Sequence, residues 1–371
     1  MSRGVRRPDA ADRARRTGLI TALEIDGAGG HPGAWRGAEV DPSAILTGEL
    51  ALRAVQRAEA AGVDLATFAD ALEAPADVPE RVSARLDALG LAARIAPATE
   101  RIGLVPTITV THTEPFHVQA SVATLDWVSA GRAGWLVDVS SSAEAAAVIG
   151  RRSPAPEADT WREARYVVDV SRRLWDSWED DAIIRDAPSG RFVDRERIHY
   201  VDFESPSFSV KGPSIVPRPP QGHPVTALRV SSPEAVQAAG DVDLVLLPGA
   251  TDVEARVAAV RAAGAGRVLL SISVLLDDDT ATAVRRADGA EELDHIGGVA
   301  RLADLIEEWA AAGIDGVHLR PASLELDVPL IADRLLPLLR DRTLVGAARP
   351  GSLRSRLGLS RPANRYEGSR R

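Results

Sequence analysis

Hydroxyl, carboxyl and imidazole side chains recur where apolar segments of this sequence end. Thr107 and Thr109 lie near the end of an apolar, β-branched run at 102–110, and Asp70 closely follows a second run at 63–68. Hydroxyls and a carboxylate can hydrogen-bond the polar edge of a flat organic ligand. A divalent metal would instead need several converging carboxylates or histidines. The pattern therefore favours a site for an organic ligand or cofactor and indicates no metal site.

Other candidates follow further apolar runs along the chain. They are His31 and Trp35 after 18–25, His112 after 102–110, Ser140 after 134–139, Ser231 and Ser232 after 225–230, and Arg320 after 314–319. A polar ring around an apolar interior suits an aromatic ligand with polar edges. No HExxH, GxSxG or P-loop motif is present, so the commonest zinc-peptidase, serine-hydrolase and phosphate-loop patterns are excluded.

Parallel strands would bring these side chains to one edge, because the carboxyl ends of such strands point the same way. The apolar patterns predict strands at 18–25, 63–68, 102–110, 134–139, 225–230, 242–247, 267–275 and 314–319. They predict helices at 44–61, 83–96, 116–128, 160–178, 232–239, 251–263, 299–312 and 328–339. Eight strand–helix units predict an α/β fold, a (β/α)8 TIM barrel, with an open doubly wound sheet as the structural alternative.

The connections divide the chain further. Residues 179–223 are long and rich in Gly and Pro, which predicts an ordered excursion between strands 4 and 5. We interpret 1–17 as a disordered N-terminal arm and 18–348 as the barrel. Residues 349–371 form a basic tail, expected to be solvated or to contact another subunit.

Bulk composition narrows the classes of function. A net charge of −9 over 371 residues argues against general binding to nucleic acid or membrane surfaces. The absence of cysteine excludes disulfides and thiolate zinc sites. No apolar run reaches membrane-spanning length, and the Arg-rich N-terminus is not followed by a secretory hydrophobic region, so a cytoplasmic protein is expected.

One set of motifs carries a family resemblance. The pieces ATERIGL, EPF and ATLDWVSAGRAGW, with Thr107 and Thr109 between the first two, are followed by LWDSWEDDA and FSVKGP. Together they resemble the bacterial luciferase-like flavin monooxygenases. Within that family they are most similar to the branch of nitrilotriacetate monooxygenase and dibenzothiophene-sulfone monooxygenase. The motifs are spread over much of the first 225 residues.

The resemblance implies a two-component monooxygenase, in which reduced FMN from a separate flavin reductase reacts with O2 to oxygenate a small organic substrate. It implies FMN-binding roles for Asp70, Thr107, Thr109, Ser140, Ser231 and Ser232. His31, Trp35 and His112 are candidates for the substrate wall, and no catalytic acid or base is singled out. Relatives of this kind usually pair, so a homodimer or a higher oligomer is expected.

Several positions depart from the family pattern. Leu228, Arg229 and Val230 stand where the family has Gln-Ala-Gly before the phosphate-loop serines, and Ala235 stands in place of a glycine. A β-carbon restricts both the backbone and its approach to a phosphate, so weak FMN binding is expected. A deazaflavin-dependent oxidoreductase and a non-catalytic relative deficient in flavin binding are the alternatives.

Overall fold

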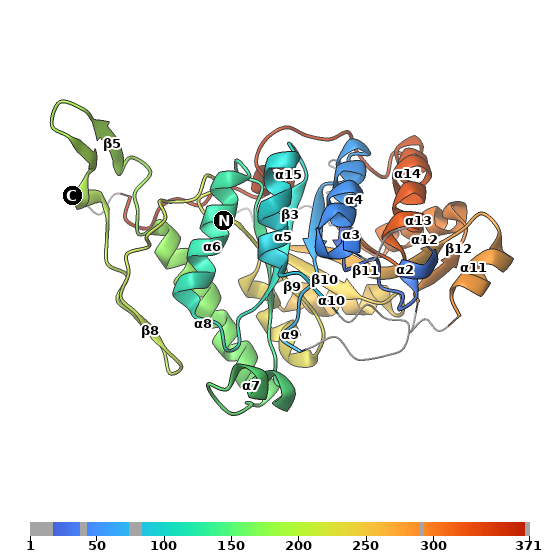
Figure 1. Ribbon diagram of the computed structural model, residues 1–371, viewed down its shortest axis with the longest axis horizontal. Helices are drawn as coiled ribbons and strands as arrows, with labels where there is room; N and C mark the ends of the chain where they lie inside the picture. Colours follow the sequence, from blue (N-terminus) through green and yellow to red (C-terminus); the bar gives the residue numbers. More distant parts are fainter. Residues whose placement is uncertain (1–17, 38–42, 74–83, 289–292, 368–371) are drawn as a thin grey trace, which may run out of the picture.

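Eight parallel strands close into a barrel in this computed structural model, which describes residues 18–37, 43–73, 84–288 and 293–367. The strand order is β1–β2–β3–β4–β9–β10–β11–β13, and β13 pairs back to β1. Helices surround the barrel on its outside (Figure 1). The predicted TIM barrel is confirmed, and the open-sheet alternative is wrong.

The strand positions agree with the sequence pattern. The barrel strands are β1 (Ile20–Ile25), β2 (Leu65–Phe68), β3 (Gly103–Thr109), β4 (Gly134–Asp138), β9 (Val225–Arg229), β10 (Leu244–Pro248), β11 (Arg267–Leu276) and β13 (Gly316–Pro321). Side chains alternate along each strand. Ala22 and Val105 therefore belong to the cluster inside the barrel, whereas Leu23 and Leu104 pack against the helices.

The outer layer contains most of the helices. They are α2 (Ala34–Gly37), α3 (Ser43–Leu46), α4 (Glu49–Ala60), α5 (Ala88–Ile95), α6 (Pro115–Val128), α7 (Ala143–Ile149), α8 (Glu157–Asp176), α9 (Pro233–Ala238), α10 (Val253–Ala262), α11 (Thr280–Arg286), α12 (Val299–Ala311), α13 (Leu324–Leu330), α14 (Leu336–Asp341) and α15 (Leu353–Arg356). Short 3-10 turns are η1 (Ala96–Ala98), η2 (Arg195–Arg197) and η3 (Ala239–Asp241), and η4 (Ile331–Leu335) is a π-helical turn.

Two predicted helices near the N-terminus were too long. The segment 44–61 forms two helices, because Gly48 adopts a left-handed φ of 70° between α3 and α4. The segment 83–96 becomes helical only at α5. There the Asp87 carboxylate accepts a hydrogen bond from the backbone N–H of Gly90 at 2.6 Å, which fixes the helix start.

Other corrections concern elements that the pattern concealed. The sequence pattern predicts no helix between 134–139 and 160–178, but the structure contains α7 there, capped by the Ser142 hydroxyl. Between β11 and α12 the structure inserts α11 and the short strand β12 (His295–Gly297), which pairs only with the end of β11. The predicted helix 328–339 begins earlier, at α13, and the π-helical turn η4 interrupts it.

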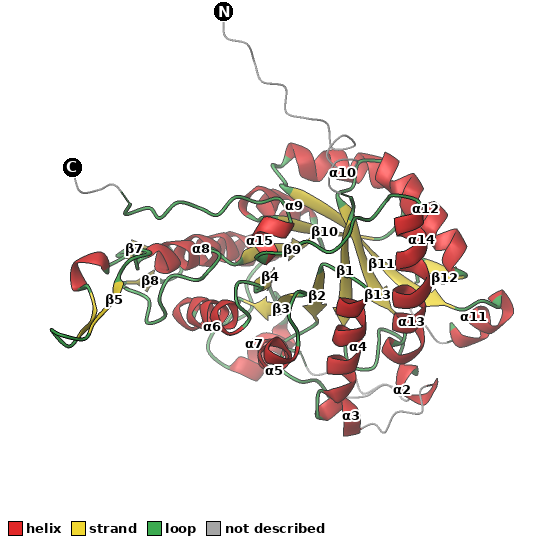
Figure 2. Ribbon diagram, turned by 90° about the horizontal axis from the view of Figure 1, so that it is seen from above, coloured by secondary structure: helices red, strands yellow, loops and turns green. Residues whose placement is uncertain are grey.

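Residues 179–223 form the ordered excursion predicted between strands 4 and 5 of the barrel. It contains two antiparallel pairs, β5 (Ile183–Asp186) with β6 (Arg191–Val193) and β7 (Phe203–Glu204) with β8 (Ser209–Val210). Figure 2 shows it projecting to one side of the barrel, with the C-terminal segment running toward it. Arg218 holds it to α8 through an ion pair with Asp176 at 3.0 Å.

Part of the C-terminal segment is buried, although its basic composition predicted a solvated or intersubunit arm. Leu353 and Leu357, four residues apart, lie on one side of a helical turn and are buried in the cluster inside the barrel. Arg354 between them donates to Asp243 at 2.7 Å and to the His223 carbonyl at 2.9 Å. This segment therefore seals the amino end of the barrel.

Two further expectations concern the chain as a whole. The predicted N-terminal arm, residues 1–17, lies outside the described residues. The helices of the described part are too short or too polar to cross a lipid bilayer.

Candidate active site

Three charged side chains meet inside the barrel where its strands end. Glu24 on β1 faces inward, two residues after the inward-facing Ala22. Arg320 on β13 donates from Nε to Glu24 Oε1 at 2.9 Å, and Arg229 on β9 forms an ion pair with the other carboxylate oxygen. In the strand order β9 lies opposite β1, so the Arg229–Glu24 pair spans the barrel. We call Glu24, Arg229 and Arg320 the mouth triad.

The carboxylate of the mouth triad is ionised near neutral pH. Its side chain is only 7% exposed, and burial favours the protonated acid. The positive charges of Arg229 and Arg320 outweigh that effect and lower the pKa of Glu24 to about 2. Glu24 therefore orients the two guanidinium groups and is not a proton donor near neutral pH.

A neutral histidine forms the layer beneath the triad. His318 precedes Arg320 by two residues on β13 and is fully buried. Its ring nitrogens lie 2.8 Å from the hydroxyls of Thr67 and Ser271. Burial lowers the pKa of His318 to about 3, so the ring carries no charge and these hydroxyls satisfy it. The barrel interior is thus closed below the triad.

The two threonines predicted on strand 3 lie beside the charged layer. Thr107 and Thr109 are buried and share the inward face of β3 with Val105. Thr109 donates from Oγ1 to Asp138 Oδ2, at the end of β4, over 3.2 Å. Burial raises the pKa of Asp138, while the Thr109 hydrogen bond acts in the opposite direction. Burial therefore favours the protonated form of Asp138.

A cavity of about 690 Å³ opens at the ends of β2 and β3. Asp70, Thr107 and Thr109 all line it, with Leu89 and Val118 among its apolar residues. The structure therefore brings three of the predicted cofactor residues to one cavity, which is large enough for a fused-ring ligand.

Asp70 also has a structural task. Its two carboxylate oxygens accept backbone hydrogen bonds from Ala71 at 2.8 Å and Ala88 at 2.9 Å, which tie the loop after β2 to the start of α5. Burial raises the pKa of Asp70, and these two hydrogen bonds oppose that rise. Its role as a flavin contact stays a prediction.

Two of the predicted substrate-wall residues lie in a neighbouring hollow. His31 and Trp35 line a cavity of about 90 Å³ that shares Ala84 and Arg85 with the larger one. Nδ1 of His31 accepts from the Gly33 N–H at 2.9 Å, which leaves the ring proton on Nε2, 3.1 Å from a backbone carbonyl of 288. The His31 ring is therefore held by contacts with its own loop and with residue 288.

His112 lines neither of these two cavities. Its backbone is left-handed, with φ of 67°, a conformation that is uncommon for a residue with a side chain. Both ring nitrogens are buried without a hydrogen-bond partner among the described residues, and burial lowers the pKa of the ring. The structure does not place it beside Thr107 and Thr109 in the larger cavity.

The serines predicted for cofactor binding are separated. Ser140 donates to Glu73 at 3.0 Å, and Glu73 lines the larger cavity. Ser232 instead caps α9 by accepting from the Ala235 N–H at 3.2 Å, while Ser231 is exposed. Neither Ser231 nor Ser232 lines the two cavities. The methyl group of Ala235 is fully buried in the helix layer, so it packs the fold and does not face an incoming phosphate.

Sequence reasoning missed the centre of this site. Glu24 and His318 were not singled out, and Arg229 was considered only as a phosphate partner. The available signal was strand alternation, because a charged residue on the inward face of an apolar strand must meet a partner across the barrel.

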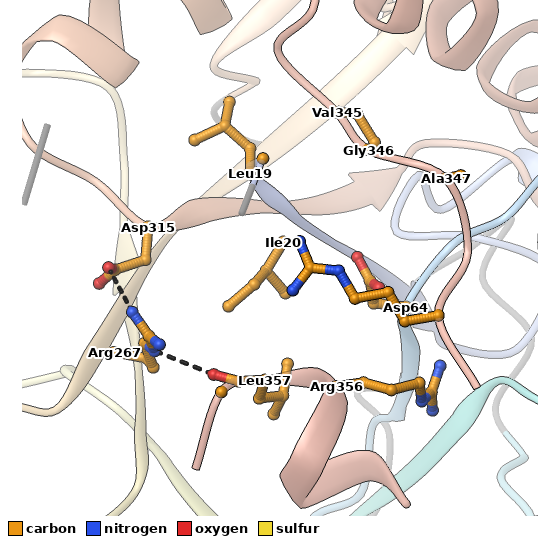
Figure 3. A pocket seen from close by; sticks show the side chains of 13 residues that line it. Leu19, Ile20, Asp64, Arg267, Asp315, Val345, Gly346, Ala347, Arg356 and Leu357 are labelled. Atoms are coloured by element: carbon orange, nitrogen blue, oxygen red, sulfur yellow. Dashed lines mark hydrogen bonds and ion pairs between the residues drawn. The ribbon is translucent and has the colours of Figure 1, made fainter. Parts of the chain in front are cut away.

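The cavity that the described residues form at the amino end of the barrel is too small for an organic ligand. A cavity of about 30 Å³ lies there between the first strand and the C-terminal segment (Figure 3). Arg267 crosses it, donating to Asp315 at 3.3 Å and to the Leu357 carbonyl at 3.1 Å. Its volume suits one or two water molecules.

Comparison with known proteins identifies the family. Residues 30–323 match the luciferase-like monooxygenases. The chain belongs to this family. Nitrilotriacetate monooxygenase component A of Aminobacter aminovorans is 36% identical over 216 residues, covering 55% of this chain and 48% of that protein. N-acetyl-S-(2-succino)cysteine monooxygenase of Bacillus subtilis is 34% identical over 201 residues, covering 54% and 46%. The first of these confirms the branch named from the sequence motifs.

A solved structure extends the fold comparison to almost the whole chain. The EDTA monooxygenase of Chelativorans sp. BNC1 superposes with a TM-score of 0.83 at 20% identity, over 93% of this chain and 99% of that chain. The chain spans about half the length of the two curated relatives named above.

The cavity residues fit the ring of the flavin that the family implies. Buried hydroxyls of Thr107 and Thr109 and the Asp70 carboxylate surround a space with apolar walls, which suits a flat ring with a polar edge. The described residues fit the phosphate of the flavin less well than its ring. Ser231 offers an exposed hydroxyl, whereas the nearest arginine in the sequence, Arg229, is bound to Glu24.

Proposed function

We propose that this chain is the oxygenating component of a two-component flavin-dependent monooxygenase acting on a small organic substrate. The observation that carries the proposal is the family match over 30–323, joined to a hydroxyl-lined cavity at the carboxyl end of the barrel. Active sites of TIM barrels lie at that end. Reduced FMN would come from a separate flavin reductase, consistent with the name "component A" of one relative.

Bound reduced FMN would supply the electrons that activate O2. Thr107 and Thr109 would hold the polar edge of the ring, and the apolar walls at Leu89 and Val118 would exclude water from it. Burial raises the pKa of Asp138, whose carboxyl group accepts a hydrogen bond from the Thr109 hydroxyl.

The test follows flavin with the purified protein. FMN fluorescence is titrated with protein, and photoreduced FMN is then mixed with oxygenated buffer in the presence and absence of the chain. We expect saturable quenching and a changed rate of flavin reoxidation. Absence of both effects would contradict the proposal, and saturation by a deazaflavin with none by FMN would favour hydride-transfer chemistry.

A matched pair of variants tests where the flavin ring binds. Thr107→Val removes a hydroxyl from the cavity, whereas Thr124→Val removes one on α6 that only bonds the Ala120 carbonyl at 2.8 Å. We expect weaker FMN binding in the first variant and parent-like binding in the second. Equal affinities in both would place the flavin elsewhere.

We also propose a homodimer, with the excursion as its contact surface. Trp175 and Trp178 lie at and just after the end of α8. They bond the carbonyls of Gln119 at 3.1 Å and Ser214 at 2.8 Å within the chain. Phe192 is 62% exposed on the excursion and is a better candidate. Light scattering of the parent and of Phe192→Ser tests this; a 39.3 kDa particle from the parent at micromolar concentration would contradict it.

A further inference from the structure

The mouth triad carries one more positive charge than negative charge. Arg229 and Arg320 share the single carboxylate of Glu24, and each uses one nitrogen for it. Nε of Arg229 is buried without a hydrogen-bond partner. Among the described residues, the structure gives the two terminal nitrogens of Arg320 no partner either. The terminal N–H donors of Arg320 thus stay available, whereas the unpaired Nε of Arg229 is enclosed by protein atoms.

These donors face the open end of the barrel. The side chains of Arg229 and Arg320 are 30% and 37% exposed, while that of Glu24 below them is 7% exposed. The layer underneath holds the buried, neutral His318. A ligand that enters the mouth therefore meets the guanidinium groups before it can meet the carboxylate.

One neighbouring carboxyl group could compensate the excess charge. Asp138 is near enough to Arg229 for their charges to interact, but its hydrogen bond goes to Thr109. No ion pair joins Asp138 to an arginine among the described residues, and burial favours its protonated form. The excess positive charge is therefore matched best by a ligand with a single negative charge.

We propose that the mouth triad is an oxyanion-binding site that holds the carboxylate of an organic substrate between Arg229 and Arg320. Planar guanidinium groups bind carboxylates through paired N–H donors. A flavin phosphate offers the same chemistry, but as a dianion it would leave uncompensated negative charge beside Glu24. This assignment rests on the proposed function, because it names the substrate class of that site.

Glu24 gains a defined task in this arrangement. It holds both guanidinium groups in place in the empty site, and it competes with an incoming carboxylate for their donors. Glu24→Gln keeps a hydrogen-bonding side chain of the same shape and removes the competing charge. This variant should therefore bind a carboxylate ligand more tightly than the parent, a result that a purely structural triad would not give.

The experiment is calorimetric titration of the full chain with benzoate and with its neutral isostere benzamide. We expect benzoate to bind and benzamide to bind at least tenfold more weakly. Arg320→Gln should weaken benzoate at least tenfold, and Glu24→Gln should strengthen it severalfold. Arg301→Gln, which changes an arginine 59% exposed on α12, is the matched control and should equal the parent.

Three results would overturn the proposal. The first is equal affinity for benzoate and benzamide, and the second is unchanged benzoate affinity in Arg320→Gln. The third result would assign the site to the phosphate of the cofactor. In that case Arg320→Gln weakens the binding of inorganic phosphate and FMN but not of riboflavin, which lacks the phosphate. The parent would also fail to bind benzoate. Melting curves of each variant verify folding, and Glu24→Gln provides the readout if an arginine variant does not fold.

The proposed function fails independently of this site. If the parent binds benzoate as described but neither binds FMN nor changes its reoxidation, the monooxygenase proposal is wrong and the oxyanion site stands. If FMN binds and benzoate does not, the reverse holds.

Discussion

The two ends of the barrel both contain arginine–carboxylate pairs, yet they use them differently. At the amino end, Arg354 is 7% exposed and donates to Asp243 and to a backbone carbonyl. At the carboxyl end, Arg320 is 37% exposed, and a single donated hydrogen bond to Glu24 is seen among the described residues. The first arginine is fully occupied by its own chain, and the second keeps donors toward the mouth.

Burial explains what each pair can do. A buried pair holds the structure together, because removing one partner leaves an uncompensated charge in a medium of low dielectric constant. A half-exposed pair contributes little to stability, since water competes for it. The comparison teaches that arginine at the amino end of this barrel is structural, whereas arginine at the carboxyl end is available for binding.

The largest expected effect tests the amino end. Arg354→Gln leaves the Asp243 carboxylate without its cation and removes the donor to the His223 carbonyl. We expect the free energy of unfolding to fall by about 3–5 kcal/mol, the usual result of breaking a buried pair. Urea-induced unfolding followed by circular dichroism measures it.

The same chemical change at the carboxyl end is the control. In Arg320→Gln, the buried Glu24 keeps Arg229 as its partner, and the arginine that is lost is 37% exposed. We expect a loss of about 1 kcal/mol or less. Equal losses in the two variants would remove the distinction between the two ends.

The next effect concerns the apolar seal of the amino end. Leu353 is fully buried and packs against Gly103 at the start of β3, where an added β-carbon would lie 2.6 Å from it. Leu353→Ala should lower the free energy of unfolding by about 2–4 kcal/mol through lost burial and the cavity left behind. Leu46→Ala, on a side chain 52% exposed, should change it very little. Parent-like stability of Leu353→Ala would show that the C-terminal segment does not seal the barrel.

A smaller effect depends on pH and separates Glu24 from ordinary carboxylates. Burial acts to raise the pKa of Glu24, but the charges of Arg229 and Arg320 together have the larger effect. The net result is a pKa lowered from 4.5 to about 2. A carboxyl group with a depressed pKa in the folded state stabilises that state above its unfolded pKa. The stability advantage of the parent over Glu24→Gln should therefore be constant above pH ~4.5 and decline as the pH falls toward ~2. A difference that does not change between these values would show that Glu24 is not ionised in the triad.

Much of the fold followed from the sequence, because strands of a barrel bury both faces and appear as short apolar runs. The run at 102–110 and its Pro-initiated helix at 115 illustrate this. The prediction for the C-terminal segment failed because that segment does not contain such an apolar run. Its arginines suggested solvent, and only the spacing of Leu353 and Leu357 indicated burial. The overall composition of the segment did not indicate that Leu353 and Leu357 lie on one side of a helical turn and pack into the barrel.

The candidate site was predicted less completely. Thr107, Thr109 and Asp70 could be located, because the end of a barrel strand fixes their place. The pairing of Glu24 with Arg229 could not, since it joins residues 205 positions apart whose contact depends on the closure of the barrel. His31 and His112 were also named because they follow predicted strands, yet the structure places neither in the larger cavity.

The smallest expected effect tests whether the hydroxyls at the mouth serve the ligand or the neighbouring carboxyl group. Thr109→Val removes a hydroxyl that donates to Asp138 and lines the larger cavity. A lost neutral hydrogen bond is worth about 1 kcal/mol, so FMN affinity should fall by a factor of about five to ten. The Asp138 pKa should also rise, because the Thr109 hydrogen bond acts to lower it. FMN titrations across a pH series measure both effects. A shifted pH profile with unchanged affinity at its optimum would show that Thr109 serves Asp138 alone, and would leave Thr107 as the threonine that contacts the flavin.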